Sequence, residues 1–183
     1  MALGDRNIIG DVTQTLQNLL GDLDVTLDSP ATLPTGGETD YRRLNLFLYQ
    51  VLENPFAKNQ PWGSPSATVE AYPALALNLF YMLTPYARDT ISAHQVLTHA
   101  MGILHDNSIV TGATLFGSLP VAVEQLAIIL CPMTLEELTR IWNALQSPYR
   151  LSVCYEVRIA LLQSDIRRDV TRVSIKTDVF QRI

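Results

Sequence analysis

Charged residues are scarce in this sequence, and the scarcity excludes several classes of protein. Only 17% of the 183 residues are charged and 48% are hydrophobic, against roughly 25% charged residues in an average globular domain. A disordered chain would show the opposite balance. The formal net charge of −5 argues against a dedicated nucleic-acid-binding protein, which needs a basic surplus to displace counterions from phosphates. Either a large core or surface hidden against other chains explains this composition.

Cysteines are equally few, and their spacing excludes the common sulfur motifs. Cys131 and Cys154 form neither a CxxC pair nor another recognisable set of metal ligands. A disulfide between them stays open, but we expect two reduced thiols inside the domain. A chain of this length can bury enough surface to fold without a disulfide or a metal.

Long apolar runs are also lacking. The longest run, Leu75–Tyr81, is interrupted by Asn78 and is far shorter than the ~20 residues of a membrane-spanning helix. Charged residues within positions 1–7 occupy the place where a signal peptide would be apolar. We therefore expect cytoplasmic synthesis and no membrane span.

Three histidines are present, but they do not form a metal site. His94, His99 and His105 lack the i, i+4 spacing of a helical zinc site. The sequence also has no P-loop, no G-x-G-x-x-G and no G-x-S-x-G motif. We predict no catalytic residue, no cofactor and no metal site.

One alternative from another functional class remains. Cys154, Glu156 and a histidine of the second predicted helix could serve a small-ligand-binding or enzymatic α+β domain. This alternative requires a concave pocket in which the three groups converge. Arg158 shares a predicted strand face with Glu156, which favours a structural ion pair between the two or an interface contact over catalysis.

Three segments have the apolar periodicity of amphipathic helices, approximately 8–23, 90–105 and 134–147. Asp5 is expected to cap the first helix. The pattern Thr134-Leu-Glu-Glu137 is a capping box, which predicts the start of the third.

Four segments read as strands, approximately 44–52, 74–83, 125–130 and 151–161. Thr84-Pro85 is expected to end the second of them. The small residues on one face of that strand, Ala74, Ala76 and Asn78, could let a helix lie close to the sheet. Apolar and polar residues alternate over residues 173–179. This pattern indicates a further strand or an arm that pairs with a neighbouring subunit.

These elements lack regular β-α-β alternation, which predicts an α+β fold. We expect a mainly antiparallel sheet of four to five strands with about three flanking helices on one face. Residues 5–165 would form this domain, and residues 166–183 would form a C-terminal strand or arm.

Several residues are candidates for partner contact. Trp62 lies in the proline-rich loop 55–65 and is expected either to fill the domain's own core or to anchor a partner. The basic patch near residue 168 is expected to meet protein carboxylates. The full set of candidate contacts is Phe56, Lys58, Trp62, Arg167, Arg168, Arg172, Lys176 and Phe180.

Five segments together resemble one known family. They are the segments 8–20, 44–55, 72–86 and 94–105 and, most specifically, TLEELTRIWNALQSPYRLSVCYEVR at 134–158. Together they resemble the tail-cap or tail-terminator proteins of extracellular contractile injection systems, which are phage-tail-like particles of the virulence-cassette and antifeeding-prophage type. The resemblance covers most of residues 5–162.

The resemblance implies a phage tail-terminator-like fold and a structural role. Such proteins form a ring on the particle end away from the baseplate, terminate polymerisation of the inner tube and the sheath, and stabilise the extended sheath. The implied partners are further copies in a homohexameric ring, the inner tube and the sheath, with no nucleic acid. The resemblance supplies no catalytic residues and places the protein in an assembled particle that can leave the cell.

Overall fold

The computed structural model describes residues 7–32, 42–58, 60–64, 66, 68–162 and 164–170. The main sheet is formed by β1 (Asp24–Thr26), β2 (Arg42–Glu53), β4 (Leu75–Ala87), β5 (Ile109–Thr111), β6 (Gln125–Cys131) and β7 (Val153–Leu162). Its strand order is β1-β2-β4-β7-β6-β5. β1 runs parallel to β2 and all other neighbours pair antiparallel. The mainly antiparallel sheet is confirmed, but within the described residues it has six strands rather than four to five.

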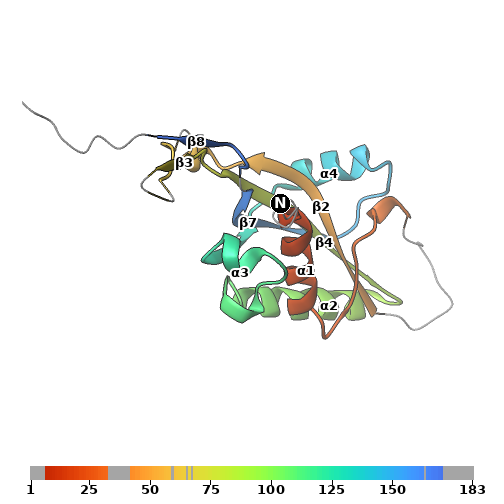
Figure 1. Cartoon of the computed structure of the whole chain (residues 1–183). Helices are drawn as coiled ribbons and strands as arrows, with labels where there is room; N and C mark the ends of the chain where they lie inside the picture. The colour runs from red at the N-terminus through yellow and green to blue at the C-terminus, as the bar shows by residue number, and fades with distance from the viewer. Residues whose placement is uncertain are drawn as a thin grey trace, which may run out of the picture.

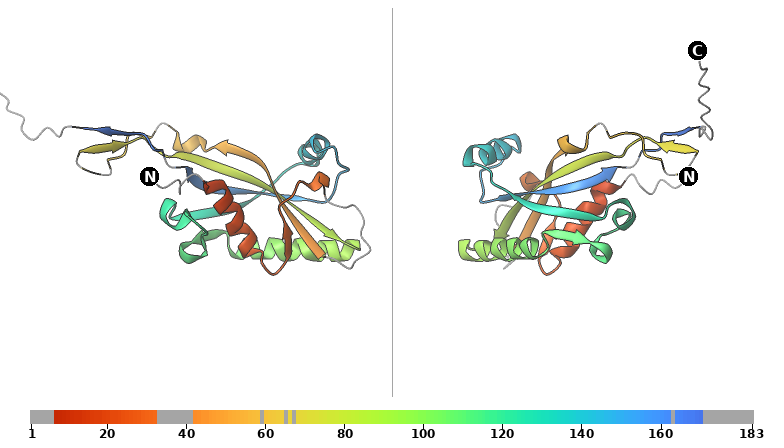
Figure 2. Two further views of the ribbon diagram at one scale, coloured as in Figure 1. Left: turned by 45° about the vertical axis from the view of Figure 1, so that its right-hand side comes forward. Right: turned by 90° about the vertical axis from the view of Figure 1, so that its left-hand side faces the viewer.

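A separate two-stranded ribbon is formed by β3 (Val69–Ala71) and β8 (Arg167–Asp169). It projects from one end of the main sheet (Figures 1 and 2). The expected division into a domain at 5–165 and a C-terminal strand or arm at 166–183 stays a prediction. Among the tail residues, 171–183 lie outside the described part of the chain.

The described residues contain four α-helices: α1 (Ile8–Leu19), α2 (Thr90–Asp106), α3 (Leu119–Ala122) and α4 (Leu135–Ala144). Three short 3-10 turns accompany them: η2 (Pro30–Thr32), η3 (Pro55–Ala57) and η4 (Gly112–Thr114). About three helices were expected. The additional one, α3, has only four residues, too few to produce a helical period in the sequence.

Helices cover both faces of the sheet, so the prediction of one covered face is wrong. The large core lies between the sheet and α1, α2 and α3, and α4 packs on the opposite face (Figure 1). Strands alternate their side chains between faces. Met82 and Cys154 therefore point away from the large core and join Leu138 and Trp142 of α4 in a second cluster.

The expected apolar stripe of α1 is confirmed, since Ile8, Val12 and Leu16 are almost fully buried. Asn7 occupies the N-cap position and makes no side-chain cap hydrogen bond. Asp5, the expected cap, lies outside the described residues.

The capping box of α4 is confirmed. The Thr134 hydroxyl accepts from the Glu137 N–H, and the Glu137 carboxylate accepts from the Thr134 N–H at 2.8 Å.

β4 does not end at Thr84-Pro85 but continues to Ala87. β7 pairs with β4 only as far as Leu83, so Pro85 lies where β4 has one paired neighbour. A missing N–H is tolerated at such an edge position.

Candidate functional site

The projecting ribbon gathers several of the residues selected from the sequence. Glu70 pairs with Arg168 across its two strands. Gly63 and Ala71 form two further backbone hydrogen bonds, of 3.0 and 2.7 Å, which add the loop before β3 to the ribbon. The ribbon thereby brings the segment around residue 168 beside the segment that contains residues 63 and 70.

Trp62 packs within this ribbon. Its ring meets Tyr72 edge-on, with 5.4 Å between centroids. The guanidinium of Arg168 lies 4.2 Å from its centroid, which is cation–π geometry. Arg168 also donates from Nε to Glu70 at 2.7 Å. Trp62 is thus only partly buried and packs outside the main core, so the first of its two predicted roles is not observed.

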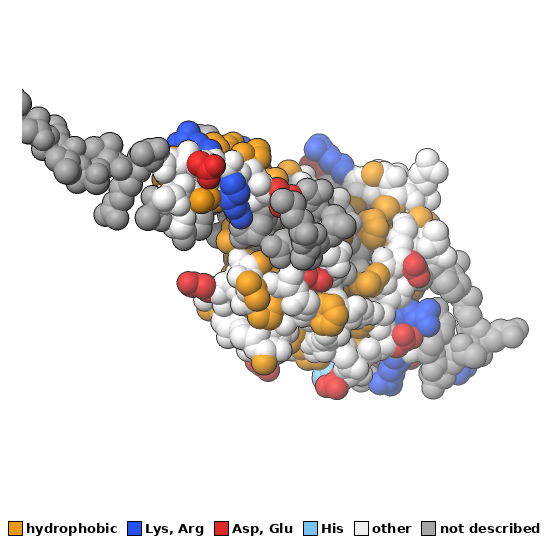
Figure 3. Space-filling model, in the orientation of Figure 1, with side chains coloured by type: hydrophobic (Ala, Val, Ile, Leu, Met, Phe, Trp, Pro, Cys, Tyr) orange, Lys and Arg blue, Asp and Glu red, His pale blue; other side chains and the backbone are white. Residues whose placement is uncertain are grey.

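Arg167 is exposed and donates to the carbonyl oxygen of Ser164 at 3.0 Å. The space-filling view shows basic, acidic and apolar side chains interspersed over the ribbon (Figure 3). The remaining candidates, Arg172, Lys176 and Phe180, lie outside the described residues.

Phe56 and Lys58 lie at the η3 turn that follows β2. Asn54 caps this turn by accepting from the Phe56 N–H at 2.9 Å. The Phe56 side chain is 89% exposed, and Lys58 forms an ion pair with Glu53 at 2.8 Å. A large aromatic side chain is therefore held in solvent on a capped turn.

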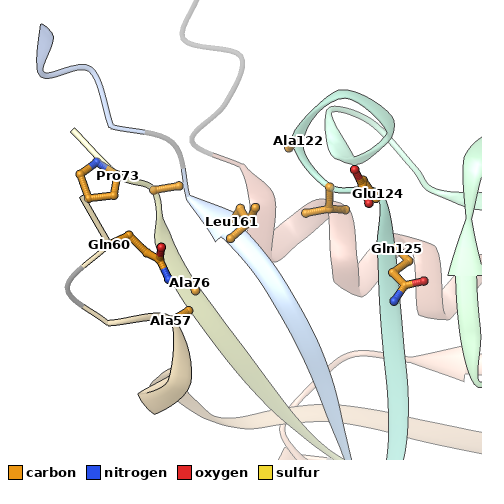
Figure 4. Close-up of a pocket in the computed structure, with 10 residues that line it drawn as sticks. Ala57, Gln60, Pro73, Ala76, Ala122, Glu124, Gln125 and Leu161 are labelled. Atoms are coloured by element: carbon orange, nitrogen blue, oxygen red, sulfur yellow. The ribbon is translucent and has the colours of Figure 1, made fainter. Parts of the chain in front are cut away.

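A groove of about 580 Å³ lies beside η3 (Figure 4). One side carries Ala57, Gln60 and Pro73, the other carries Ala122 and Glu124, and Leu161 lies between them. Glu124 is the one ionisable side chain among the described lining residues. The groove therefore suits apolar contact with a partner of matching shape. It does not supply the pair of ionisable groups that acid/base chemistry needs.

Ala74 and Ala76 line this groove together with Ala122 of α3, and the close approach of a helix to this face of β4 stays a prediction. The third small residue of that face, Asn78, is buried and donates to Glu156 at 2.7 Å. The sequence places Asn78 on a face of small residues and as an interruption of an apolar run, but it does not predict its bond to Glu156. A polar residue inside such a run was the available signal of a buried hydrogen bond.

The predicted pair of Glu156 and Arg158 is present, with two hydrogen bonds of 2.7 and 2.6 Å. The enzymatic alternative fails on geometry. Cys154 packs with α4, whereas α2 packs on the opposite face of the sheet and its His94 and His99 are exposed. Burial raises the pKa of the Cys154 thiol to about 11, so little of the reactive thiolate forms at neutral pH.

The described part of the chain offers neither a metal cluster nor a membrane-spanning helix. Within it, no group of three or more His, Cys, Asp or Glu side chains is placed to hold a metal ion. None of the helices among the same residues is long and apolar enough to cross a membrane.

The fold is similar to two solved structures. One is the sheath/tube terminator of PVC, an extracellular contractile injection system, in the extended state, with 19% identity and a TM-score of 0.70 over 96% of this chain. The other is the tube terminating cap of the anti-feeding prophage, with 17% identity and a TM-score of 0.64 over 95% of this chain. The chain spans 64% and 60% of the lengths of those two proteins.

No curated protein matches the sequence. A protein family described as the Pvc16 N-terminal domain matches residues 8–175. The chain therefore belongs to the Pvc16 N-terminal domain family.

Proposed function

We propose that this protein is a structural cap of a contractile injection particle. It forms a ring on the end away from the baseplate, where it terminates polymerisation of the inner tube and the sheath and stabilises the extended sheath. The observation that carries this proposal is the shared fold, which extends over 96% of the chain, with a protein described as a sheath/tube terminator. The role is one of assembly and assigns no reaction to the chain.

The distribution of exposed apolar side chains supports an assembly role. Phe56 is 89% exposed, Val121 on α3 is 94% exposed and Ile91 on α2 is 65% exposed. These side chains belong to different elements, and Figure 3 shows apolar groups reaching the surface over α1 and α3 as well as over the ribbon. A ring subunit needs two different surfaces for its own copies and a third surface for the polymer it caps.

The partners in this proposal are further copies of the chain, the inner tube and the sheath. We take the ring to be a homohexamer, as the resemblance to tail terminators implies. The capped particle would then carry the protein with it when it leaves the cell.

Two parts of the chain are proposed as contacts. The first is the C-terminal segment 166–183, which begins in the ribbon. Val170 donates its N–H to the Thr68 carbonyl at 2.9 Å, which ties the described end of this segment to the residue before β3. We assign residues 170–180 to strand pairing with a neighbouring subunit or with the sheath. The second is the loop 55–65 with Phe56, Lys58 and Trp62, which we assign to the tube.

Electron microscopy of particles made with and without this protein tests the function. Loss of the cap should give tubes or sheaths of uncontrolled length, because nothing then stops subunit addition. Particles of the usual length without the protein would refute the capping role.

A variant lacking residues 170–183 tests the segment separately. It should keep the circular dichroism spectrum of the domain but fail to form rings or to dock on particles. If this variant still caps tubes of normal length, the contact assigned to the C-terminal segment is wrong while the capping role stands.

A further inference from the structure

Two thiols are opposed across neighbouring strands of the main sheet. Cys131 is the last residue of β6, Cys154 is the second residue of β7, and they are direct partners in the register. Opposed residues of an antiparallel pair have Cα atoms about 4.5–5.5 Å apart. A disulfide accepts Cα separations of about 4.4–6.8 Å. The backbone spacing of a disulfide is therefore available without movement of either strand.

The two thiols differ in their access to solvent. Cys154 is 1% exposed and belongs to the cluster beneath α4, while Cys131 packs at the edge of that cluster and is partly exposed. Both are free thiols, and the Cys131 Sγ lies 4.0 Å from the Ile129 carbonyl oxygen. A reagent in solution can reach Cys131 first, and Cys154 can be reached only from within the protein.

We propose that Cys131 and Cys154 form an intramolecular disulfide by exchange with a small dissolved disulfide such as oxidised glutathione. The Cys131 thiolate attacks the small disulfide, whose sulfur–sulfur bond breaks, and one glutathione leaves as a thiol. The Cys154 thiolate then attacks the Cys131 sulfur and expels the second glutathione. The two cysteines are oxidised, one glutathione disulfide is reduced, and the two cysteine protons end on the released thiols.

The bond would fasten a part of the sheet that has a paired strand on one side only. β5 pairs with β6 only along Gln125–Ala127, so among the described strands none covers the outer edge of β6 from Ile129 to Cys131. The chain between the two cysteines builds α4. The disulfide would therefore join the open end of β6 to the central strand β7. It would also tie together the two chain segments that lead into and out of α4. The pair would be reduced inside a cell and would close in oxidising surroundings.

The test uses the folded full-length chain incubated in a mildly alkaline glutathione buffer, followed by intact-mass measurement and peptide mapping. We expect the loss of two hydrogens, a peptide joining Cys131 to Cys154, and a Tm higher by roughly 5–10 °C. The Cys154→Ser variant should stop at a glutathione adduct on Cys131. The Cys131→Ser variant should stay unmodified while folded.

Other outcomes would overturn the proposal. One is a wild-type protein that accumulates the Cys131 adduct while Cys154 stays free, because the second exchange then does not occur in the fold. Another is a disulfide that forms only after denaturation. Since Cys131 is partly exposed, the Cys131→Ser variant is expected to fold, and its circular dichroism spectrum checks this.

Discussion

The guanidinium of Arg158 lies against the carboxylate of Glu156 on the same strand, with Nε 2.7 Å from Oε1 and Nη2 2.6 Å from Oε2. Glu156 is only 7% exposed and also accepts from Asn78. Asn54 donates to Asn78 at 3.0 Å and accepts from the Phe56 N–H. A chain of hydrogen bonds across β7, β4 and the end of β2 therefore connects a buried charge to the turn that presents Phe56.

Replacing Arg158 should lower the free energy of unfolding, because it leaves the buried Glu156 carboxylate without a cationic partner. In Arg158→Gln the Glu156 carboxylate keeps its Asn78 hydrogen bond but loses its cationic partner. Breaking a fully buried pair costs about 3–5 kcal/mol. The Arg158 side chain is 43% exposed, so solvent screening lowers our expectation to about 2 kcal/mol of unfolding free energy. Urea unfolding measures the change.

Arg140→Gln is the matched control for that substitution. Arg140 and Glu136 form an ion pair whose side chains are 75% and 74% exposed, and its loss should be barely measurable. Adding Glu156→Gln to Arg158→Gln should recover part of the lost stability by removing the unpaired charge. Equal effects of Arg158→Gln and Arg140→Gln would contradict the role of the buried carboxylate.

Gly117 should tolerate no side chain, because of its backbone conformation and its neighbour. Its φ is +61°, and a Cβ there would lie 2.5 Å from the Asp11 carboxylate carbon. That carboxylate accepts from the Ser118 N–H at 2.8 Å and hydroxyl at 2.6 Å, which fastens the loop before α3 to α1. Gly117→Ala should cost about 2–3 kcal/mol in unfolding free energy.

Gly102→Ala provides a control of opposite sign. Gly102 lies within α2 and is exposed, and a Cβ at this position would meet only open space. Alanine there should stabilise the protein by about 0.5–1 kcal/mol through its better helix propensity. If Gly117→Ala stabilises the protein as Gly102→Ala does, the Asp11 carboxylate is not held firmly against the loop before α3.

The long elements could be predicted from the sequence because their patterns repeat over many residues. The apolar stripe of α1, the capping box of α4 and the alternation of β7 each describe an element of ten residues or more. β1, β5 and α3 have three or four residues each. No period can be established over so few positions, and tertiary pairing rather than local pattern decides their structure.

The candidate contacts could be predicted only as residue types in loops. Nothing in the sequence relates Trp62 to Arg168, because the contact depends on β3 pairing with β8 across about a hundred residues. Glu156 and Arg158 were predictable because residues two apart on a strand share a face. The burial of that pair was not predictable, since it requires Asn78 from another strand.

Trp62→Ala should separate docking from folding. The Trp62 side chain contacts Tyr72 and Arg168 in the ribbon and lies outside the main core. We expect a change of about 1 kcal/mol or less in unfolding free energy, as for a cation–π contact at an exposed site. We also expect a clear loss of capped particles, which electron microscopy can count.

Trp142→Ala is the control for loss of stability. Trp142 is 1% exposed beneath α4, and its truncation should cost about 3–5 kcal/mol. A Trp62→Ala protein that caps particles as well as the wild type would remove this loop from the proposed tube contact.

Alkaline pH should destabilise the protein through buried groups that must stay protonated. Burial raises the pKa of Tyr81 from 10.0 to about 12, partly opposed by its hydrogen bond with Thr13. The neutral phenol is thus favoured in the fold. Its contribution, about 3 kcal/mol, is complete below pH 10 and is lost as pH rises towards 12. Burial also raises the pKa of the Cys154 thiol from 9.0 to about 11. The stability should therefore begin to decline near pH 9.

Urea midpoints measured under reducing conditions from about pH 8 to about pH 11.5 would follow this decline. Tyr81→Phe removes the titrating hydroxyl, so its midpoint should start lower, because the bond to Thr13 is lost, but should fall less steeply above pH 10. An unchanged slope in Tyr81→Phe would show that other groups cause the alkaline unfolding. Reducing conditions are needed because the same rise in pH deprotonates Cys131 and Cys154, and a disulfide between them would stabilise the fold and mask the loss.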